Sequence, residues 1–229
     1  IVVSPEDDIE LRRIHITNRS RKRRTIEITS YAEVVLNAAA ADEAHPAFSN
    51  LFVQTEINRL RNAILCSRRP RSVDENTPWM FHLMKVHDAE IKTISYETDR
   101  SEFIGRGFTI NDPKAMKLKN GLSGNSGSVL DPVIAIQYSI VIEPQETAVV
   151  DMIFGAADTK EICNQLIEKY QDRHLTNRVL ELVWTHSQVI LRQINASESD
   201  AQLYSRLASS IIFSNPSLRT DPANIIKNH

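Results

Sequence analysis

The chain has 229 residues, 41% of them hydrophobic, with a net charge of -2 and a pI near 6.4. This length permits one large β domain or two smaller units with a sizeable core, and the charge balance excludes a broad basic surface for nucleic acid. No apolar run approaches the roughly 18 residues that a membrane helix needs. The two cysteines, Cys66 and Cys163, lack a CxxC or His-rich partner, so we expect no metal and no cofactor.

Alternating apolar residues predict strands along the first two thirds of the chain, over residues 8–18, 26–36, 51–57, 64–68, 79–87, 91–98, 134–142 and 148–154. In the first strand the alternation changes phase, which indicates a bulge near Arg12 and Arg13. Two hairpins are predicted because short polar turns join neighbouring strands. One hairpin pairs 8–18 with 26–36, and the other pairs 134–142 with 148–154. Residues 38–46 are interpreted as a loop or a short helical turn.

The hydrophobic period changes at Gly155, where helices are expected to begin. Asp158 is the predicted cap of a first helix, and a second helix is expected from about Thr176 to Ile194. Ser199 and Gln202 form a predicted capping box for a third helix. Strands followed by helices predict a mainly β domain over 1–156 and a short α-helical linker over 157–229.

Two basic runs occupy predicted turns, at residues 19–24 and 68–71. Such clusters can bind nucleic acid. Solvated turn charge is the favoured interpretation, because both runs lie between predicted strands.

A glycine-rich stretch offers the candidate site, since five of the six glycines lie between Gly105 and Gly127. A loop of this length in a compact domain is usually functional or disordered. Glycine lets a ligand approach the backbone, and guanidinium groups bind hydroxyls, phosphates or carboxylates. The candidate ligand-binding residues are therefore Arg100, Glu102, Phe103, Gly105, Arg106 and Gly107. The alternative is that Arg100 pairs with Asp99 or Glu102 and only tethers the loop.

The sequence gives little support for nucleotide binding or for a catalytic site. The segment from Gly121 to Gly127 is followed by a predicted strand and lacks the Lys-Ser or Lys-Thr of a nucleotide-binding loop. No pair of carboxylates and no GxSxG motif indicates a catalytic site, so no catalytic residue is assigned. Trp184 could stack on a sugar, but its position within a helix predicts that it packs instead.

Several separate stretches resemble cyclic β-1,2-glucan synthases: SPEDDIELRR (4–13), TSYAEVVL (29–36), HPAFSNLFVQTE (45–56), DRSEFIGRG (99–107), GSVLDP (127–132) and WTHSQVILR (184–192). The chain is similar, more distantly, to cellobiose and chitobiose phosphorylases. This resemblance implies a large antiparallel β-supersandwich of the galactose-mutarotase-like type, then linker helices. An α/α six-barrel carrying the catalytic Asp would follow, beyond residue 229. Both ends of the chain look cut, so we expect a piece of a larger protein.

The resemblance also implies a function in carbohydrate metabolism. The parent would be a membrane-bound glucosyltransferase at the cytoplasmic face of a bacterial inner membrane, which trims β-1,2-glucan chains by phosphorolysis. This piece would support the barrel and present residues 100–107 to β-1,2-glucan or a gluco-oligosaccharide, and homodimerisation is implied as possible. The rivals are a structural dimerisation module without a ligand and, less favoured, a self-sufficient polysaccharide hydrolase or lyase.

Overall fold

A computed structural model describes residues 1–70, 72, 75, 77–212 and 220–227. These residues form two compact units, Ile1–Leu180 and Glu181–His229. The strands all lie in the first unit: β1 (Val2–Val3), β2 (Ile9–Thr17), β3 (Arg24–Thr29), β4 (Ala32–Glu33), β5 (Val53–Asn58), β6 (Ala63–Arg68), β7 (Trp79–His87), β8 (Glu90–Asp99), β9 (Pro132–Ile142) and β10 (Thr147–Ala157).

The two longest helices are α5 and α6, which follow the strands in the chain. They are α1 (Ala39–Ala44), α2 (Pro46–Asn50), α3 (Arg100–Ile104), the 3₁₀ helix η1 (Lys114–Lys117), α4 (Lys160–Lys169), α5 (Arg173–Gln193), α6 (Glu198–Ile212) and α7 (Pro222–Ile226). The short helices α1 and α2 confirm the helical alternative predicted for residues 38–46. The first unit extends past the predicted boundary at residue 156, because α4 packs on β7 and β10.

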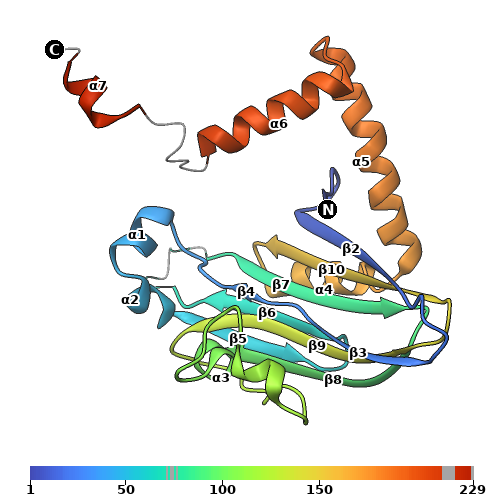
Figure 1. Ribbon diagram of the computed structural model, residues 1–229. Helices are drawn as coiled ribbons and strands as arrows, with labels where there is room; N and C mark the ends of the chain where they lie inside the picture. The colour runs from blue at the N-terminus through green and yellow to red at the C-terminus, as the bar shows by residue number, and fades with distance from the viewer. Residues whose placement is uncertain (71, 73–74, 76, 213–219, 228–229) are drawn as a thin grey trace. The chain divides into compact units, whose positions relative to one another are not determined.

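Two antiparallel sheets lie face to face and confirm the predicted mainly β fold (Figure 1). The larger sheet has the strand order β1-β2-β10-β7-β6-β5, and in the smaller sheet β9 pairs with β3, β4 and β8. Alternate residues of β9 point into the space between the sheets, where they are almost fully buried (Ile134, Ile136, Tyr138, Ile140 and Ile142). The Tyr138 hydroxyl donates to the Met84 carbonyl at 2.7 Å and so links the two sheets inside this core.

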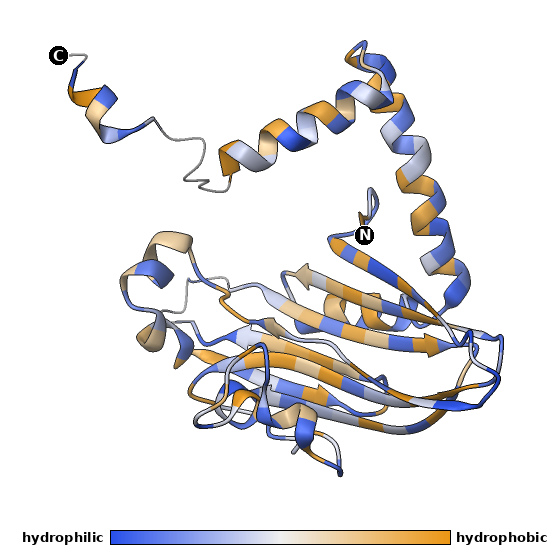
Figure 2. Cartoon of the chain, viewed as in Figure 1, coloured by the Kyte–Doolittle hydropathy of each residue, from blue (hydrophilic) through white to orange (hydrophobic). Residues whose placement is uncertain are grey.

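The other face of the larger sheet is buried as well. Leu11, Leu83 and Ile153 are cross-strand neighbours with no exposed surface, and α4 covers β7 and β10 with buried Cys163, Leu166 and Ile167. Apolar residues therefore occur on both faces of these strands. In Figure 2 the strands are accordingly rich in hydrophobic residues. This explains the phase change in β2, and the predicted bulge is wrong: β2 pairs with β10 in unbroken register from Ile9 to Thr17.

Both predicted hairpins are wrong as well. β2 pairs with β1 and β10, whereas β3 pairs with β9 in the opposite sheet. Likewise β9 and β10 belong to different sheets, although the Pro144 turn between them forms with Gln145 at φ 65. Period-two alternation records which face of a strand is buried, not which strand it pairs with, so it could not distinguish a hairpin from a crossing between sheets.

Helix boundaries also differ from the predicted ones. Thr159, not Asp158, caps α4 by accepting from the Ile162 N–H at 3.2 Å. Ser197 and Asp200, not Ser199 and Gln202, exchange the side-chain-to-backbone bonds of a capping box before α6. Short polar residues are frequent at both places, so the sequence pattern fits more than one register.

Candidate functional site

The candidate site is built around α3, which is held against the outer side of the smaller sheet. The Asp99 carboxylate accepts from the Ser101 N–H at 2.8 Å and caps the helix, and Gly105 ends it. Phe103 and Ile104 are buried with Ala135 of β9. The Phe103 and Tyr31 rings lie 4.7 Å apart. The α3 segment is therefore fixed by packing, and Phe103 faces inward, so it has no ring surface to offer a ligand.

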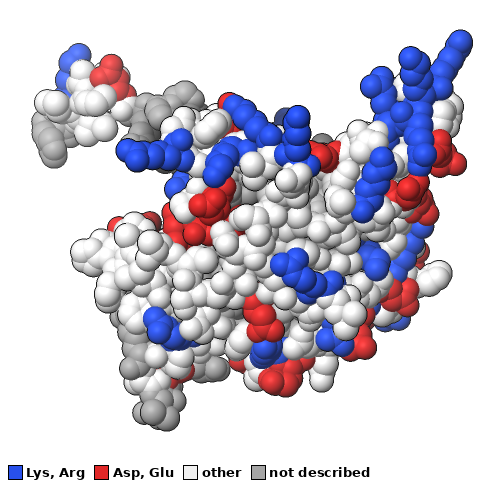
Figure 3. All heavy atoms as spheres, turned by 90° about the horizontal axis from the view of Figure 1, so that it is seen from below, with Lys and Arg blue, Asp and Glu red and all other residues white. Residues whose placement is uncertain are grey.

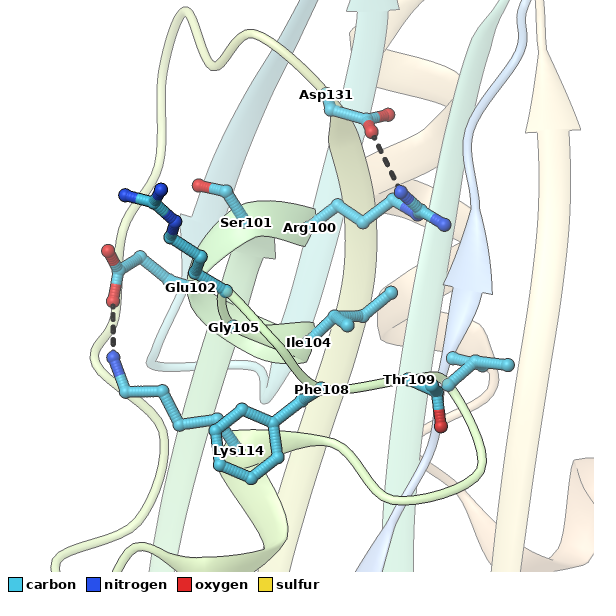
Figure 4. A pocket seen from close by; sticks show the side chains of 11 residues that line it. Arg100, Ser101, Glu102, Ile104, Gly105, Phe108, Thr109, Lys114 and Asp131 are labelled. Carbon is cyan, nitrogen blue, oxygen red and sulfur yellow. Dashed lines mark hydrogen bonds and ion pairs between the residues drawn. The ribbon is translucent and has the colours of Figure 1, made fainter.

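Arg100 anchors the start of α3 through two carboxylates. Its Nε lies 3.1 Å from Glu33 and its Nη1 lies 3.4 Å from Asp131, the latter drawn in Figure 4. The Tyr31 hydroxyl also donates to Glu33. Burial, together with the Glu33 carboxylate, raises the pKa of Tyr31 to about 12, so this donor stays protonated. Arg100 thus tethers the segment, as the alternative proposed, but through Glu33 and Asp131 and not through Asp99 or Glu102.

Beside α3 lies an open depression of about 750 Å³, shown in Figure 4. Of the six predicted site residues, Arg100, Glu102, Gly105 and Arg106 line it; Phe103 and Gly107 do not. Glu102 is paired with Lys114 at 3.4 Å. Arg106 is exposed and has no ion-pair partner among the residues described by the structure. Its guanidinium is therefore available to a ligand in the solvent.

The structure adds residues that the sequence did not single out: Phe108, Thr109, Ile110, Lys114 and Asp131. Phe108 is 38% exposed, and its ring faces the depression near Lys114 (Figure 4). An exposed aromatic ring can pack on the C–H face of a sugar, so Phe108 replaces Phe103 as the candidate stacking residue. The only signal in the sequence was its place one residue after Gly107 within the glycine-rich segment.

The side chains that line this depression include charged, hydroxyl and aromatic groups. Its lining residues include no His and no Cys, and each of its two carboxylates, Glu102 and Asp131, is paired with a cation. Among the described residues, no three His, Cys, Asp or Glu side chains come together as a metal-binding group. Guanidinium, ammonium, hydroxyl and aromatic groups together suit a polyhydroxylated ligand.

A second depression, of about 480 Å³, lies between α5 and α6 within the second unit. Trp184 lines it with Gln188, Gln202 and Arg206. Trp184 is 68% exposed, so the prediction that it packs is wrong in this structure.

The comparisons with known proteins identify the fold. The family model of the glycosyl hydrolase 94 supersandwich domain matches residues 1–173. The chain belongs to this family. The match runs through all ten strands and α4, so the sheets described above are the supersandwich.

Two similar proteins are named as enzymes that act on carbohydrates. The chain is 31% identical over 224 residues to the cyclic beta-(1,2)-glucan synthase NdvB of Rhizobium meliloti (strain 1021), covering 98% of this chain and 8% of that protein. It is 22% identical over 169 residues to the solabiose phosphorylase of Paenibacillus borealis, covering 74% of this chain and 21% of that protein. The chain is thus a glucan-synthase-related domain that spans a small part of either relative.

The turn at Gly105 provides a test of how tightly the site is built. Gly105 has φ 83 and ψ 154, a region open almost only to glycine, and a Cβ there would lie 2.7 Å from the Lys114 Cβ. Gly105→Ala should lower the free energy of unfolding by about 1–3 kcal/mol from backbone strain, with the clash adding to it. Gly107 is the matched control, because it has φ 81 but no heavy atom within 4 Å of an added Cβ. Denaturant unfolding should show a larger loss for Gly105→Ala than for Gly107→Ala, and equal losses would contradict the close approach.

Proposed function

We propose that this chain is a non-catalytic supersandwich domain of a cyclic β-1,2-glucan synthase, and that it contacts β-1,2-glucan through the depression beside α3. The observation that carries the proposal is the similarity to the glucan synthase over 98% of this chain. The parent protein would transfer glucosyl units and trim chains by phosphorolysis in a downstream α/α barrel. Its proposed location is the cytoplasmic face of a bacterial inner membrane. Among the described residues, no helix is both long and apolar enough to span a bilayer.

The lining of the depression supports a binding role. Arg106 offers an exposed guanidinium, and Phe108 offers a partly exposed ring with the Lys117 Nζ 4.6 Å from its centroid. Arg100, Glu102 and Lys114 are engaged in ion pairs within the chain. Hydrolysis or phosphorolysis needs an acid positioned against a second reacting group. Both lining carboxylates are held by cations of this chain, which favours binding over catalysis.

A second function is favoured by a specific observation. Arg100, Glu33, Asp131 and Tyr31 form a network that fastens α3 to the sheet. A network of this kind suits a purely structural module that supports a barrel or a homodimer and has no ligand. The two functions differ in whether the depression binds sugar.

Titration with β-1,2-gluco-oligosaccharides, followed by isothermal calorimetry or NMR shifts, separates them. We expect weak binding, at millimolar concentration, that Phe108→Ala weakens by about 3–10-fold, because an aromatic contact contributes about 0.5–1.5 kcal/mol. Tyr204→Ala is the matched control, since Tyr204 is 52% exposed in the second unit, and it should leave the affinity unchanged.

Two other outcomes would favour the alternative functions. No binding at millimolar oligosaccharide would favour the structural module. Release of reducing sugar or of glucose 1-phosphate by this chain alone would contradict a non-catalytic domain and support the hydrolase alternative or its phosphorylase counterpart.

A further inference from the structure

The turn between β2 and β3 carries four basic residues that the proposed function does not use: Arg19, Arg21, Lys22 and Arg23. All four side chains are exposed. Figure 3 shows Lys and Arg side chains gathered there, projecting from the end of the sandwich at the upper right of the view. This group is called the basic turn below.

The backbone of the basic turn is held in place by Asn18, which is 5% exposed. Its Nδ2 donates to the Lys22 and Ile142 carbonyls at 2.9 Å, and its Oδ1 accepts from the Ser20 N–H and hydroxyl at 3.1 and 2.7 Å. Gln145, in the neighbouring turn, adds a bond from its Nε2 to the Arg19 carbonyl at 3.2 Å. The turn is therefore an ordered part of the sandwich, and its charges are held close together despite their mutual repulsion.

Only part of this charge is neutralised within the chain. Arg23 pairs with Glu90 and, at 2.9 Å, with Glu143. The side chains of Arg19, Arg21 and Lys22 form no ion pair with any residue that the structure describes. Three unpaired cations thus face solvent on one rigid, protruding turn.

The shape and composition of the basic turn favour a flat anionic partner. The run from residue 18 to 25 contains no aromatic side chain on which a nucleobase could stack, and the chain as a whole carries a net charge of -2. A protruding turn touches a plane with its tip and keeps the acidic remainder of the surface away from it. Clusters of Lys and Arg of this size bind bilayers that contain anionic lipids. We propose that the basic turn docks this chain on an anionic lipid bilayer.

Vesicle co-sedimentation tests this proposal with the chain as given. Wild type should bind vesicles of phosphatidylglycerol and phosphatidylcholine in equal amounts, and should not bind phosphatidylcholine alone. Replacing the three unpaired cations together, by Arg19→Gln, Arg21→Gln and Lys22→Gln, should lower the partition coefficient by about 100-fold, at roughly fivefold per charge. Raised salt should weaken the binding of wild type, because these charges are exposed.

The matched control removes the same number of charges elsewhere. Arg192→Gln, Arg206→Gln and Lys227→Gln change exposed residues of the second unit and should leave vesicle binding intact. An equal loss in the control variant would overturn the proposal, since net charge alone would then explain the binding. Absence of vesicle binding by wild type would also overturn it, as would binding to RNA by the basic turn without binding to vesicles. Circular dichroism of both variants verifies that each stays folded.

Discussion

Replacing Asp151 with Asn is expected to lower the free energy of unfolding by about 3–5 kcal/mol, because it leaves the Arg13 guanidinium charged, largely buried and without its partner. The Asp151 side chain is 1% exposed and that of Arg13 is 15% exposed. Their two bonds are parallel, with Arg13 Nε at 2.6 Å from Oδ1 and Nη2 at 2.8 Å from Oδ2. Chemical denaturation of wild type and the variant measures the loss.

The same pair joins the sheet to α5, so its loss should destabilise α5 as well as β10. Arg13 also donates to Thr176 and Asn177 at 3.0 and 2.6 Å, and the Thr176 hydroxyl donates to Asp151 at 3.2 Å. In Asp151→Asn, amide hydrogen exchange should therefore quicken in the first turns of α5 before it quickens in β9. Uniform acceleration over both elements would contradict a local role of this network.

Two controls separate burial from charge. A double variant, Arg13→Met with Asp151→Leu, removes both charges and should lose less stability than Asp151→Asn alone. Arg178→Ala breaks an exposed pair with Glu6, in which Arg178 is 60% exposed, and should cost no more than about 1 kcal/mol. If Asp151→Asn lowered the free energy of unfolding as little as Arg178→Ala does, the large stabilising contribution expected of the buried pair would be refuted.

The second large effect is a loss of stability on acidification that depends on His82. This imidazole has no exposed surface. Its Nε2 lies 2.8 Å from the Ser30 hydroxyl, its Nδ1 lies 3.2 Å from the Ile153 carbonyl, and its ring stacks on Phe154. Burial lowers the pKa of His82 from 6.5 to about 4, with a further contribution from the Arg12 cation.

The direction of the pH effect follows from where the proton binds. As pH falls below about 6.5, His82 in the unfolded chain takes up a proton, whereas in the folded chain it stays neutral until about pH 4. The unfolded state is therefore favoured increasingly over this window. Since one pKa unit corresponds to about 1.4 kcal/mol, the total loss is about 3 kcal/mol between pH 6.5 and 4.

Urea unfolding at a series of pH values measures this dependence. His82→Gln cannot titrate, so its stability should fall less steeply than that of wild type between pH 6.5 and 4, whatever its stability at pH 7. The matched control is His15→Gln, because His15 is exposed on β2, and this variant should keep the slope of wild type. Identical slopes for wild type and His82→Gln would refute the assignment to His82. His87, whose pKa is lowered by burial, contributes in the same direction.

Part of the candidate site could be predicted from the sequence. The positions of Arg100, Glu102, Gly105 and Arg106 within one glycine-rich segment predicted that they would lie close together, and the structure places all four along one depression. Phe103 was indistinguishable from a ligand-binding aromatic, since the burial of its ring depends on Tyr31 and Ala135, which lie far away in the chain. Asp131 and Glu33 could not be recognised as partners of Arg100 for the same reason: 67 residues separate Arg100 from Glu33.

The sequence by itself determined where most of the strands lie. The predicted strand 79–87 coincides with β7. The alternate residues from Ile134 to Ile142 that were predicted to share one face of β9 all lie in the core between the sheets, because successive side chains of a strand point to opposite faces. It also determined the family, since identity is spread along the whole chain. Only the tertiary structure decided that β2 and β3, and β9 and β10, lie in opposite sheets. Hydrogen-bonded pairing between strands depends on the path of the chain in space, and a turn of a few polar residues permits either path.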